Sequence, residues 1–108
     1  MPLSKRARIE IYIPSGAAYG RLQTVLEREL IYTFSGCTVV SGTKGSYLGS
    51  DGTRETESIN LIYSDTPFDI DEHFARLTQY AENLKAVALE VTNEESVFIV
   101  VQEIYHSV

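Results

Sequence analysis

The stretch GCTVVSGTKGSYLGSDGTRETESINLIYSD, residues 36–65, decides the fold of this chain. Its second half shows the two-residue alternation of a β-strand. At its centre, Gly49-Ser50-Asp51-Gly52 has the composition of a tight turn, because Asp-Gly tolerates the positive φ that such turns require. The pattern therefore predicts a long hairpin, with strands over about 37–47 and 54–64.

Upstream of the hairpin, the sequence predicts a strand followed by a helix. Residues 8–14 alternate, with three isoleucines on one side, as in a strand with one buried face. From residue 17 to about 34, apolar residues recur at the spacing of one helix face. We expect Gly36 to end this helix as a left-handed C-cap, and residues 1–6 to form a flexible lead-in.

Downstream of the hairpin, a second helix and a last strand are expected. Asp69 and Glu72 have the spacing of a capping box, with Asp in the Ser/Thr role. Apolar residues then recur at steps of three and four, which predicts a helix from about 70 to 91. A stop near Lys85 is the alternative. Residues 96–105 are dense in β-branched and aromatic residues and predict a final strand.

The predicted order is strand, helix, strand, strand, helix, strand over a single domain, residues 1–108. Two right-handed β-α-β halves joined by a hairpin describe a ferredoxin-like α+β sandwich. Its four-stranded antiparallel sheet would carry both helices on one face.

Composition narrows the class of protein. A hydrophobic content of 44% and a charged content of 22% are ordinary for a globular domain. A net charge of −6 disfavours a nucleic-acid partner, since phosphate binding relies on Lys and Arg. No apolar run approaches the roughly 18 residues of a membrane span, and no apolar signal segment follows the basic start. We therefore expect a cytoplasmic protein without a membrane partner.

The helix-free face of the predicted sheet is expected to carry large apolar groups. If the isoleucines of the first strand face the helices, the outward set includes Tyr12, Ile62, Phe98 and Val100. Contiguous apolar patches of this kind are uncommon on soluble monomers. The sequence therefore predicts a homo-oligomer that packs through these sheets, and coverage by the C-terminal tail is the alternative.

The hairpin also carries a candidate ligand site. Its glycines permit bulges or close backbone approach, and Lys44 and Arg54 could hold a small anion. The predicted ligand site also includes Tyr47, Glu55 and Glu57. A mobile hairpin with solvated charges is the competing interpretation, and a protein partner could use the same residues.

The sequence predicts no catalytic residue and no metal site. His73 lies among acidic residues, but a first helical turn favours acidic residues through the helix dipole alone. Cys37 is the only cysteine, and we expect it to be a small buried side chain rather than a reactive thiol. No cofactor is identified by these residues.

Short motifs provide two resemblances. Gly36-Cys37-Thr38-Val39, Gly45-Ser46-Tyr47, Asp51-Gly52, Glu55–Ser58 and Glu95-Ser96-Val97 look like a family of small bacterial proteins with a Gly-x-Thr-Val, Gly-x-aromatic and Asp-Gly hairpin. More distantly, Gly36-x-Thr38-Val39 and Lys44-Gly45 before a long loop resemble PII-like and divalent-cation-tolerance proteins. That resemblance implies a trimer that binds small ligands, often nucleotides, between subunits near the hairpin. The glycine- and lysine-bearing segment that PII proteins carry before their last strand is absent here, where Thr92–Glu95 is acidic.

A third resemblance, in topology only, is to dimeric α+β barrel monooxygenases. It implies a small enzyme with an apolar pocket lined by Tyr12, Ile62 and Phe98. The leading prediction is instead a non-enzymatic oligomeric binding or regulatory protein with the hairpin as its contact element.

Overall fold

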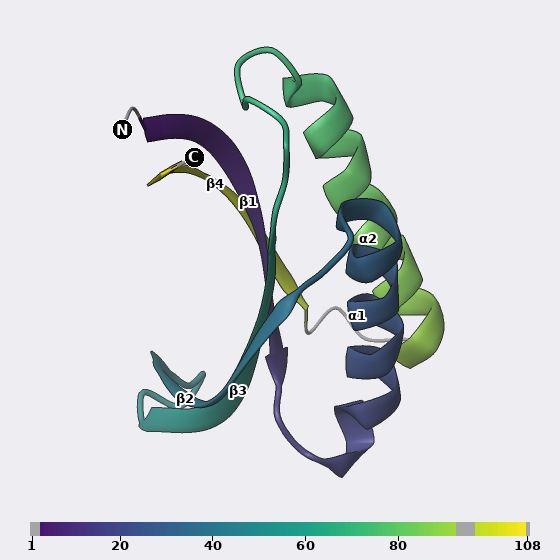
Figure 1. The fold of residues 1–108 in the computed structure, drawn as a ribbon. Coiled ribbons are helices and arrows are strands. Elements are labelled where there is room, and N and C mark those ends of the chain that lie inside the picture. Colours follow the sequence, from purple (N-terminus) through teal and green to yellow (C-terminus); the bar gives the residue numbers. More distant parts are fainter. Residues whose placement is uncertain (1–2, 93–96, 108) are drawn as a thin grey trace.

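The computed structural model describes residues 3–92 and 97–107 of the chain. Four antiparallel strands form one sheet in the order β2-β3-β1-β4, and both helices cover the same face of it (Figure 1). This arrangement confirms the predicted ferredoxin-like α+β fold. The elements are β1 (Leu3–Pro14), a short 3-10 helix η1 (Ala17–Tyr19), α1 (Gly20–Phe34), β2 (Thr38–Leu48), β3 (Arg54–Asp65), α2 (Phe74–Thr92) and β4 (Phe98–Ser107).

The core lies between the sheet and the two helices. The isoleucines of β1 point into it, and each helix contributes the apolar stripe that its sequence predicts. Complete burial of one such aliphatic side chain contributes about 1.5–3 kcal/mol. The buried set includes Ile9, Ile11 and Ile13 of β1, Leu22, Leu26 and Leu30 of α1, Ile62 of β3, and Leu77, Leu84 and Ala88 of α2.

The first strand begins at Leu3, earlier than the expected residue 8. Residues 3–7 pair with β4 in antiparallel register, so residues 3–6 belong to the sheet, where a flexible lead-in was expected. Residues 1–2 lie outside the described residues. Pairing with β4 supplies the backbone hydrogen bonds that a free leading segment would lack. The last strand runs to Ser107, beyond the expected residue 105. The predicted start of that strand at Ser96 lies outside the described residues.

Lys5 ties the N-terminal part of β1 to two other segments. Its ammonium nitrogen lies 3.8 Å from Asp69, 3.4 Å from Asp71 and 3.6 Å from Glu103, measured to the carboxylate oxygens. The surrounding carboxylates raise the pKa of Lys5, with Asp69 as the largest cause. The cluster therefore holds β1, β4 and the segment before α2 together.

The ends of the helices differ from the prediction at two points. Ser35, not Gly36, takes the left-handed conformation after α1, with φ of 72° and its N–H donating to the Ile31 carbonyl. Gly36 already belongs to the approach to β2, where its carbonyl accepts a hydrogen bond from the Ser64 hydroxyl at 2.5 Å. The left-handed position therefore falls one residue earlier than expected.

The second helix starts at Phe74 rather than at about residue 70. The Asp69 carboxylate accepts backbone N–H groups from Asp71 at 2.9 Å and Glu72 at 3.3 Å, which closes a separate turn before the helix. The helix ends at Thr92, close to the predicted residue 91 and beyond Lys85. No helix in the described part of the chain is long and apolar enough to cross a membrane.

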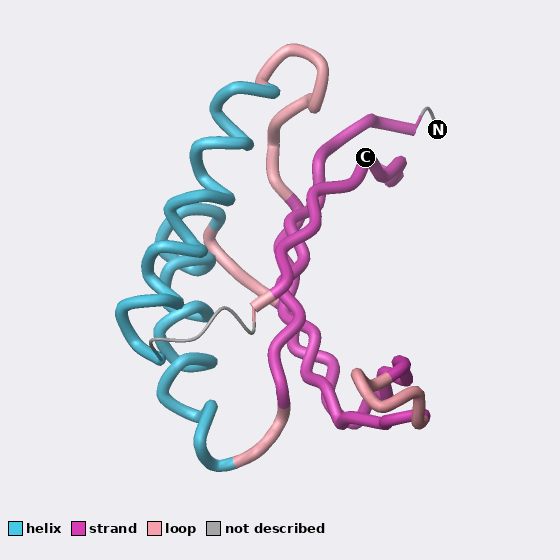
Figure 2. The backbone as a smooth tube through the Cα atoms, turned by 180° about the vertical axis from the view of Figure 1, so that it is seen from behind, coloured by secondary structure: helices cyan, strands magenta, loops and turns pink. Residues whose placement is uncertain are grey.

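The β2–β3 hairpin forms as predicted and bends away from the helices. Gly49 and Thr53 close the turn through a 2.8 Å backbone hydrogen bond, and Gly52 has φ of 84°. A β-bulge interrupts β2 between Val40 and Thr43. Both the tip of this hairpin and the N-terminal end of β1 curve away from the helices, so the helix-free face of the sheet is concave (Figures 1 and 2). We call this helix-free, concave side the open face.

Candidate functional site

A row of four large apolar side chains crosses the open face, one from each strand. Leu61 lies opposite both Val40 and Tyr12 in the strand register, and Tyr12 lies opposite Phe98. The Tyr12 and Phe98 rings are 5.9 Å apart between centroids. Phe98 is 65% exposed and Val40 is 38% exposed, so much of this row remains in contact with water.

A groove of about 440 Å³ lies on the open face where the hairpin bends away. The rings of Tyr12 and Phe98 form one side of it, while Ile59 and Glu57 of β3 contribute to the other. Pro14 ends the groove at the last residue of β1. The lining is mostly apolar with one carboxylate, which suits a flat apolar group better than a bare anion.

Glu10 lies beside this groove as a buried acidic residue. It is 8% exposed and sits on the open face between Tyr63 of β3 and Val100 of β4 in the strand register. The Tyr12 hydroxyl donates to its carboxylate at 3.5 Å. Burial raises the pKa of the Tyr12 phenol above its usual 10.0, and the nearby Glu10 carboxylate raises that pKa further.

The raised pKa of Tyr12 leads to a pH-dependent prediction. Since the folded chain favours the neutral phenol, this contribution to stability is present below pH 10 and is lost as pH rises through the folded-state pKa. We expect Glu10→Gln to lower the pKa of Tyr12 only part of the way, because burial is the larger cause. The pKa of Tyr12 is measured from tyrosinate absorbance during a pH titration. The absorbance of the Tyr12→Phe variant is subtracted, once for the wild type and once for Glu10→Gln. Ionisation of Tyr12 at its usual pH in the folded chain would contradict the geometry.

Ile62 does not lie on the open face, which corrects the sequence-based expectation. It is 0% exposed and belongs to the core. Along β3 the even-numbered residues face the helices: the Asn60 amide donates to the Gln23 side chain of α1 at 2.8 Å. Leu61 takes the outward position instead. The physical reason is that the polar side of β3 finds hydrogen-bond partners under the helices.

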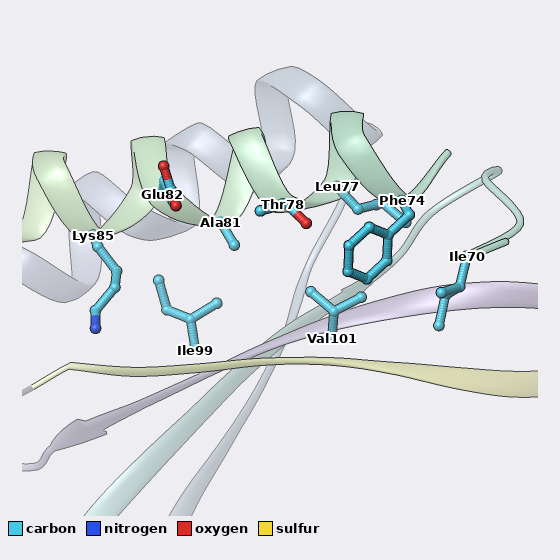
Figure 3. A pocket seen from close by; sticks show the side chains of 9 residues that line it. All are labelled: Ile70, Phe74, Leu77, Thr78, Ala81, Glu82, Lys85, Ile99 and Val101. Atoms are coloured by element: carbon cyan, nitrogen blue, oxygen red, sulfur yellow. The ribbon is translucent and has the colours of Figure 1, made fainter. Parts of the chain in front are cut away.

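The other three residues predicted for the interface do lie on the open face. Tyr12 and Phe98 form its central pair, and Val100 stands half-buried opposite Glu10. Ile99 and Val101 point the other way, toward α2 (Figure 3). A role of the open face in subunit contact stays a prediction.

The structure divides the five hairpin residues between two faces. Tyr47 lies opposite Glu55, and Glu55, Glu57 and Ile59 alternate onto the open face. The Glu55 carboxylate raises the pKa of Tyr47 through a side-chain hydrogen bond. Lys44 and Arg54 occupy the opposite face, where the Arg54 guanidinium donates to the Ser46 hydroxyl at 3.4 Å. The two cations therefore share one surface, apart from the tyrosine and the two carboxylates.

The described residues contain no group of three His, Cys, Asp or Glu side chains that could hold a metal ion. His73 packs against the Phe68 ring, with 4.9 Å between centroids. Cys37 is half-buried, and burial raises the pKa of its thiol. A raised pKa keeps the thiol protonated, which is the opposite of what a nucleophilic cysteine needs.

Several residues of the groove and its rim are absent from the sequence-based set, among them Ile59, Leu61 and Glu10. The available signal was the apolar alternation of Ile59, Leu61 and Tyr63, which sequence reasoning did not place on the open face. Glu10 carried no distinctive signal, because a polar residue between two isoleucines is typical of a strand with one solvated face.

No protein-family model matches the chain, and no curated protein matches its sequence. Solved structures share its fold. CPII, a nitrogen regulatory PII-like protein from Thiomonas intermedia K12 bound to ADP, AMP and bicarbonate, is 19% identical, with a TM-score of 0.56 over 99% of this chain and 100% of that chain. CutA1 from Oryza sativa is 13% identical, with a TM-score of 0.61 over 97% of this chain and 84% of that chain.

The divalent cation tolerance protein from Thermus thermophilus is 15% identical, with a TM-score of 0.59 over 92% of this chain and 82% of that chain. At these identities the likeness shows a shared fold. The resemblance to PII-like and divalent-cation-tolerance proteins is therefore confirmed at the level of the fold. The short motifs shared with small bacterial proteins stay a prediction.

Proposed function

We propose that this protein is a small oligomeric binding or regulatory protein whose copies associate through the open face. The observation that carries the proposal is the apolar row across that face, with Phe98 65% exposed. A second copy seated in this concave face would cover the apolar row and leave the groove beside the hairpin for a ligand held between copies (Figure 1). Removal of such surface from water stabilises association by about 25 cal/mol per Å² before the costs of binding.

The β2–β3 hairpin is the proposed contact element for a small ligand. The groove offers the Tyr12 and Phe98 rings to a planar group, but its carboxylate, Glu57, repels a phosphate. Lys44 and Arg54 lie on the other face of the hairpin, where they can meet an anion bound to an adjacent copy. A planar base with phosphates has both properties, and the related fold of CPII holds ADP and AMP. We therefore propose an adenine nucleotide as the ligand class, in a cytoplasmic protein.

The oligomer is tested by light scattering on matched variants. We expect the wild type to be an oligomer at micromolar concentration and Phe98→Glu to be monomeric, because the charge would be buried in the interface. Leu89→Glu is the control, since Leu89 is also exposed, at 46%, but lies on α2. A wild type that stays monomeric at about 100 µM would contradict the proposal, since a specific interface holds well below that concentration.

Ligand binding is tested by thermal shift with ADP. A ligand bound only by the folded state raises the unfolding midpoint. We expect Lys44→Ala with Arg54→Ala to abolish the shift. The control is Arg21→Ala with Arg28→Ala, which removes two exposed cations from α1. An equal thermal shift with ADP in both double variants would show that the hairpin cations do not bind the nucleotide.

A second candidate is a small enzyme of the dimeric α+β barrel type, favoured by the groove that Tyr12 and Phe98 line. A two-fold, sheet-on-sheet dimer would enclose that groove, whereas a three-fold assembly would place hairpins across subunit clefts. Light scattering distinguishes the two by stoichiometry. Ile62 has no part in this pocket, because it lies in the core.

A further inference from the structure

A second hollow, of about 240 Å³, lies on the helix side of the sheet, between α2 and β4 (Figure 3). Ile99 and Val101 rise from β4 toward the helix, and Ala81 points back toward the strand (Figure 3). We call this hollow the α2–β4 cleft. Its apolar wall is completed by Leu77 of α2, while Ile70 and Phe74 close one end.

The cleft exists because β4 is an edge strand. In the described part of the chain no strand lies beyond β4, so α2 overhangs the edge of the sheet there, while Leu77, Leu84 and Ala88 anchor the helix in the core. Alanine at position 81 leaves room where a larger side chain would reach the strand. Phe74 is 66% exposed, so one end of the cleft presents an aromatic ring that a ligand would cover.

The charged side chains of the cleft lie toward the end opposite Phe74, and Thr78 adds a hydroxyl beside Leu77 (Figure 3). Lys85 stands at that end beside Ile99, while the Glu82 carboxylate stays against α2, away from β4 (Figure 3). Within residues 3–92 and 97–107, Lys85 is the only cation that lines the cleft, and it forms no ion pair there. The cleft thus joins an apolar body to one positive charge.

We propose that the α2–β4 cleft binds a small apolar monocarboxylate, with its ring or chain against Ile99 and Val101 and its carboxylate at Lys85. Size agrees with this class, since a dry apolar cavity of about 150 Å³ already holds benzene. A nucleotide needs several phosphate donors, and the cleft offers one ammonium. A divalent cation needs several oxygen ligands, and among the described residues Glu82 is the only carboxylate that lines the cleft.

The site is independent of the proposed oligomer and nucleotide. The cleft lies on the helix side, and the row of Tyr12 and Phe98 lies on the open face, so the sheet separates them. Phe98→Glu should therefore abolish association without changing carboxylate binding. Failure of either proposal can be recognised without reference to the other.

The test is an NMR titration of the full chain with three probes that differ in charge: phenylacetate, phenylacetamide and phenethylamine. We expect saturable amide shifts at Ala81, Ile99 and Val101, with a Kd for phenylacetate in roughly the millimolar range. The acid should bind most tightly and the amine least. Lys85→Met should weaken phenylacetate binding about 2- to 5-fold and leave phenylacetamide unchanged.

Two substitutions of alanine by leucine on α2 test whether the ligand occupies the cleft, one inside the cleft and one outside it. Ala81→Leu fills the cleft and should weaken phenylacetate binding by at least about 10-fold, because the leucine side chain occupies the space that the ligand ring needs. Ala86→Leu makes the same change at an exposed position of the same helix and should leave binding unchanged.

Three results would overturn the proposal: no saturable shift in the wild type, full binding by Ala81→Leu, or a preference for the amine. If Ala81→Leu does not fold, the proposal is tested by the order of affinity of the three probes and by the Lys85→Met comparison. The proposal is also overturned if the wild type does not bind phenylacetate and Ala81→Leu changes the oligomeric state. That result would identify the cleft as a contact between copies.

Discussion

Ile62→Ala is expected to lower the free energy of unfolding by about 2–5 kcal/mol, because it empties a fully buried position in the core. The side chain is 0% exposed and faces the helices from the middle of β3. Surrounding side chains relax only partly into such a cavity, so the cost exceeds the lost hydrophobic transfer term. Denaturant unfolding monitored by circular dichroism measures the change.

Leu61→Ala is the matched comparison, since it removes a similar side chain one residue away on the other side of the sheet. Leu61 is half-buried in the apolar row of the open face. We expect a smaller loss of monomer stability and a clear weakening of association. The Ile62 effect should be independent of protein concentration and the Leu61 effect should depend on it. The reverse pattern would show that β3 presents its even-numbered side to a second copy.

Gly42→Val is expected to cost about 1–3 kcal/mol, because a β-branched residue is forced into a left-handed backbone conformation. Gly42 has φ of 77° at the bulge between Val40 and Thr43. Space is not the obstacle, since nothing lies within 4 Å of a Cβ built there. The cost should therefore arise from the backbone alone.

Gly36→Val is the control for that variant. Gly36 also has open space around it, but its φ lies outside the left-handed region. We expect little change in unfolding free energy there. NMR shifts should further show that Gly42→Val disturbs the pairing of Thr43 with Ile59, where the Thr43 hydroxyl donates to the Ile59 carbonyl at 2.6 Å. Equal costs at the two glycines would mean that the bulge does not need its left-handed residue.

The candidate groove was only partly predictable from the sequence. Tyr12 could be placed on the open face because its isoleucine neighbours in β1 fill the core side without ambiguity. On β3 both sides carry apolar residues, so alternation alone did not decide between Leu61 and Ile62. Hydrogen bonds of Asn60 and Ser64 on the helix side fix which face of β3 lies against the helices.

The hairpin residues show a second limit. Strict alternation along β2 would place Val40 and Lys44 on one face, but the extra residue of the bulge puts Thr43, Gly45 and Tyr47 on the face of Val40. A bulge depends on pairing with the opposite strand, which no local pattern records. The bulge therefore places Tyr47 on the open face and Lys44 on the opposite face, the reverse of what strict alternation predicts.

The order of the elements, their periods and the ferredoxin-like topology follow from local chemistry, because hydrophobic spacing and turn residues act over a few neighbours along the chain. Which side of β3 lies against the helices, where Lys5 finds its carboxylates, and that α2 overhangs β4 depend on residues distant in sequence. Only the tertiary structure determines these features, because buried polar groups must find hydrogen-bond partners when the sheet forms. The apolar surface that remains exposed then forms the open face and the α2–β4 cleft.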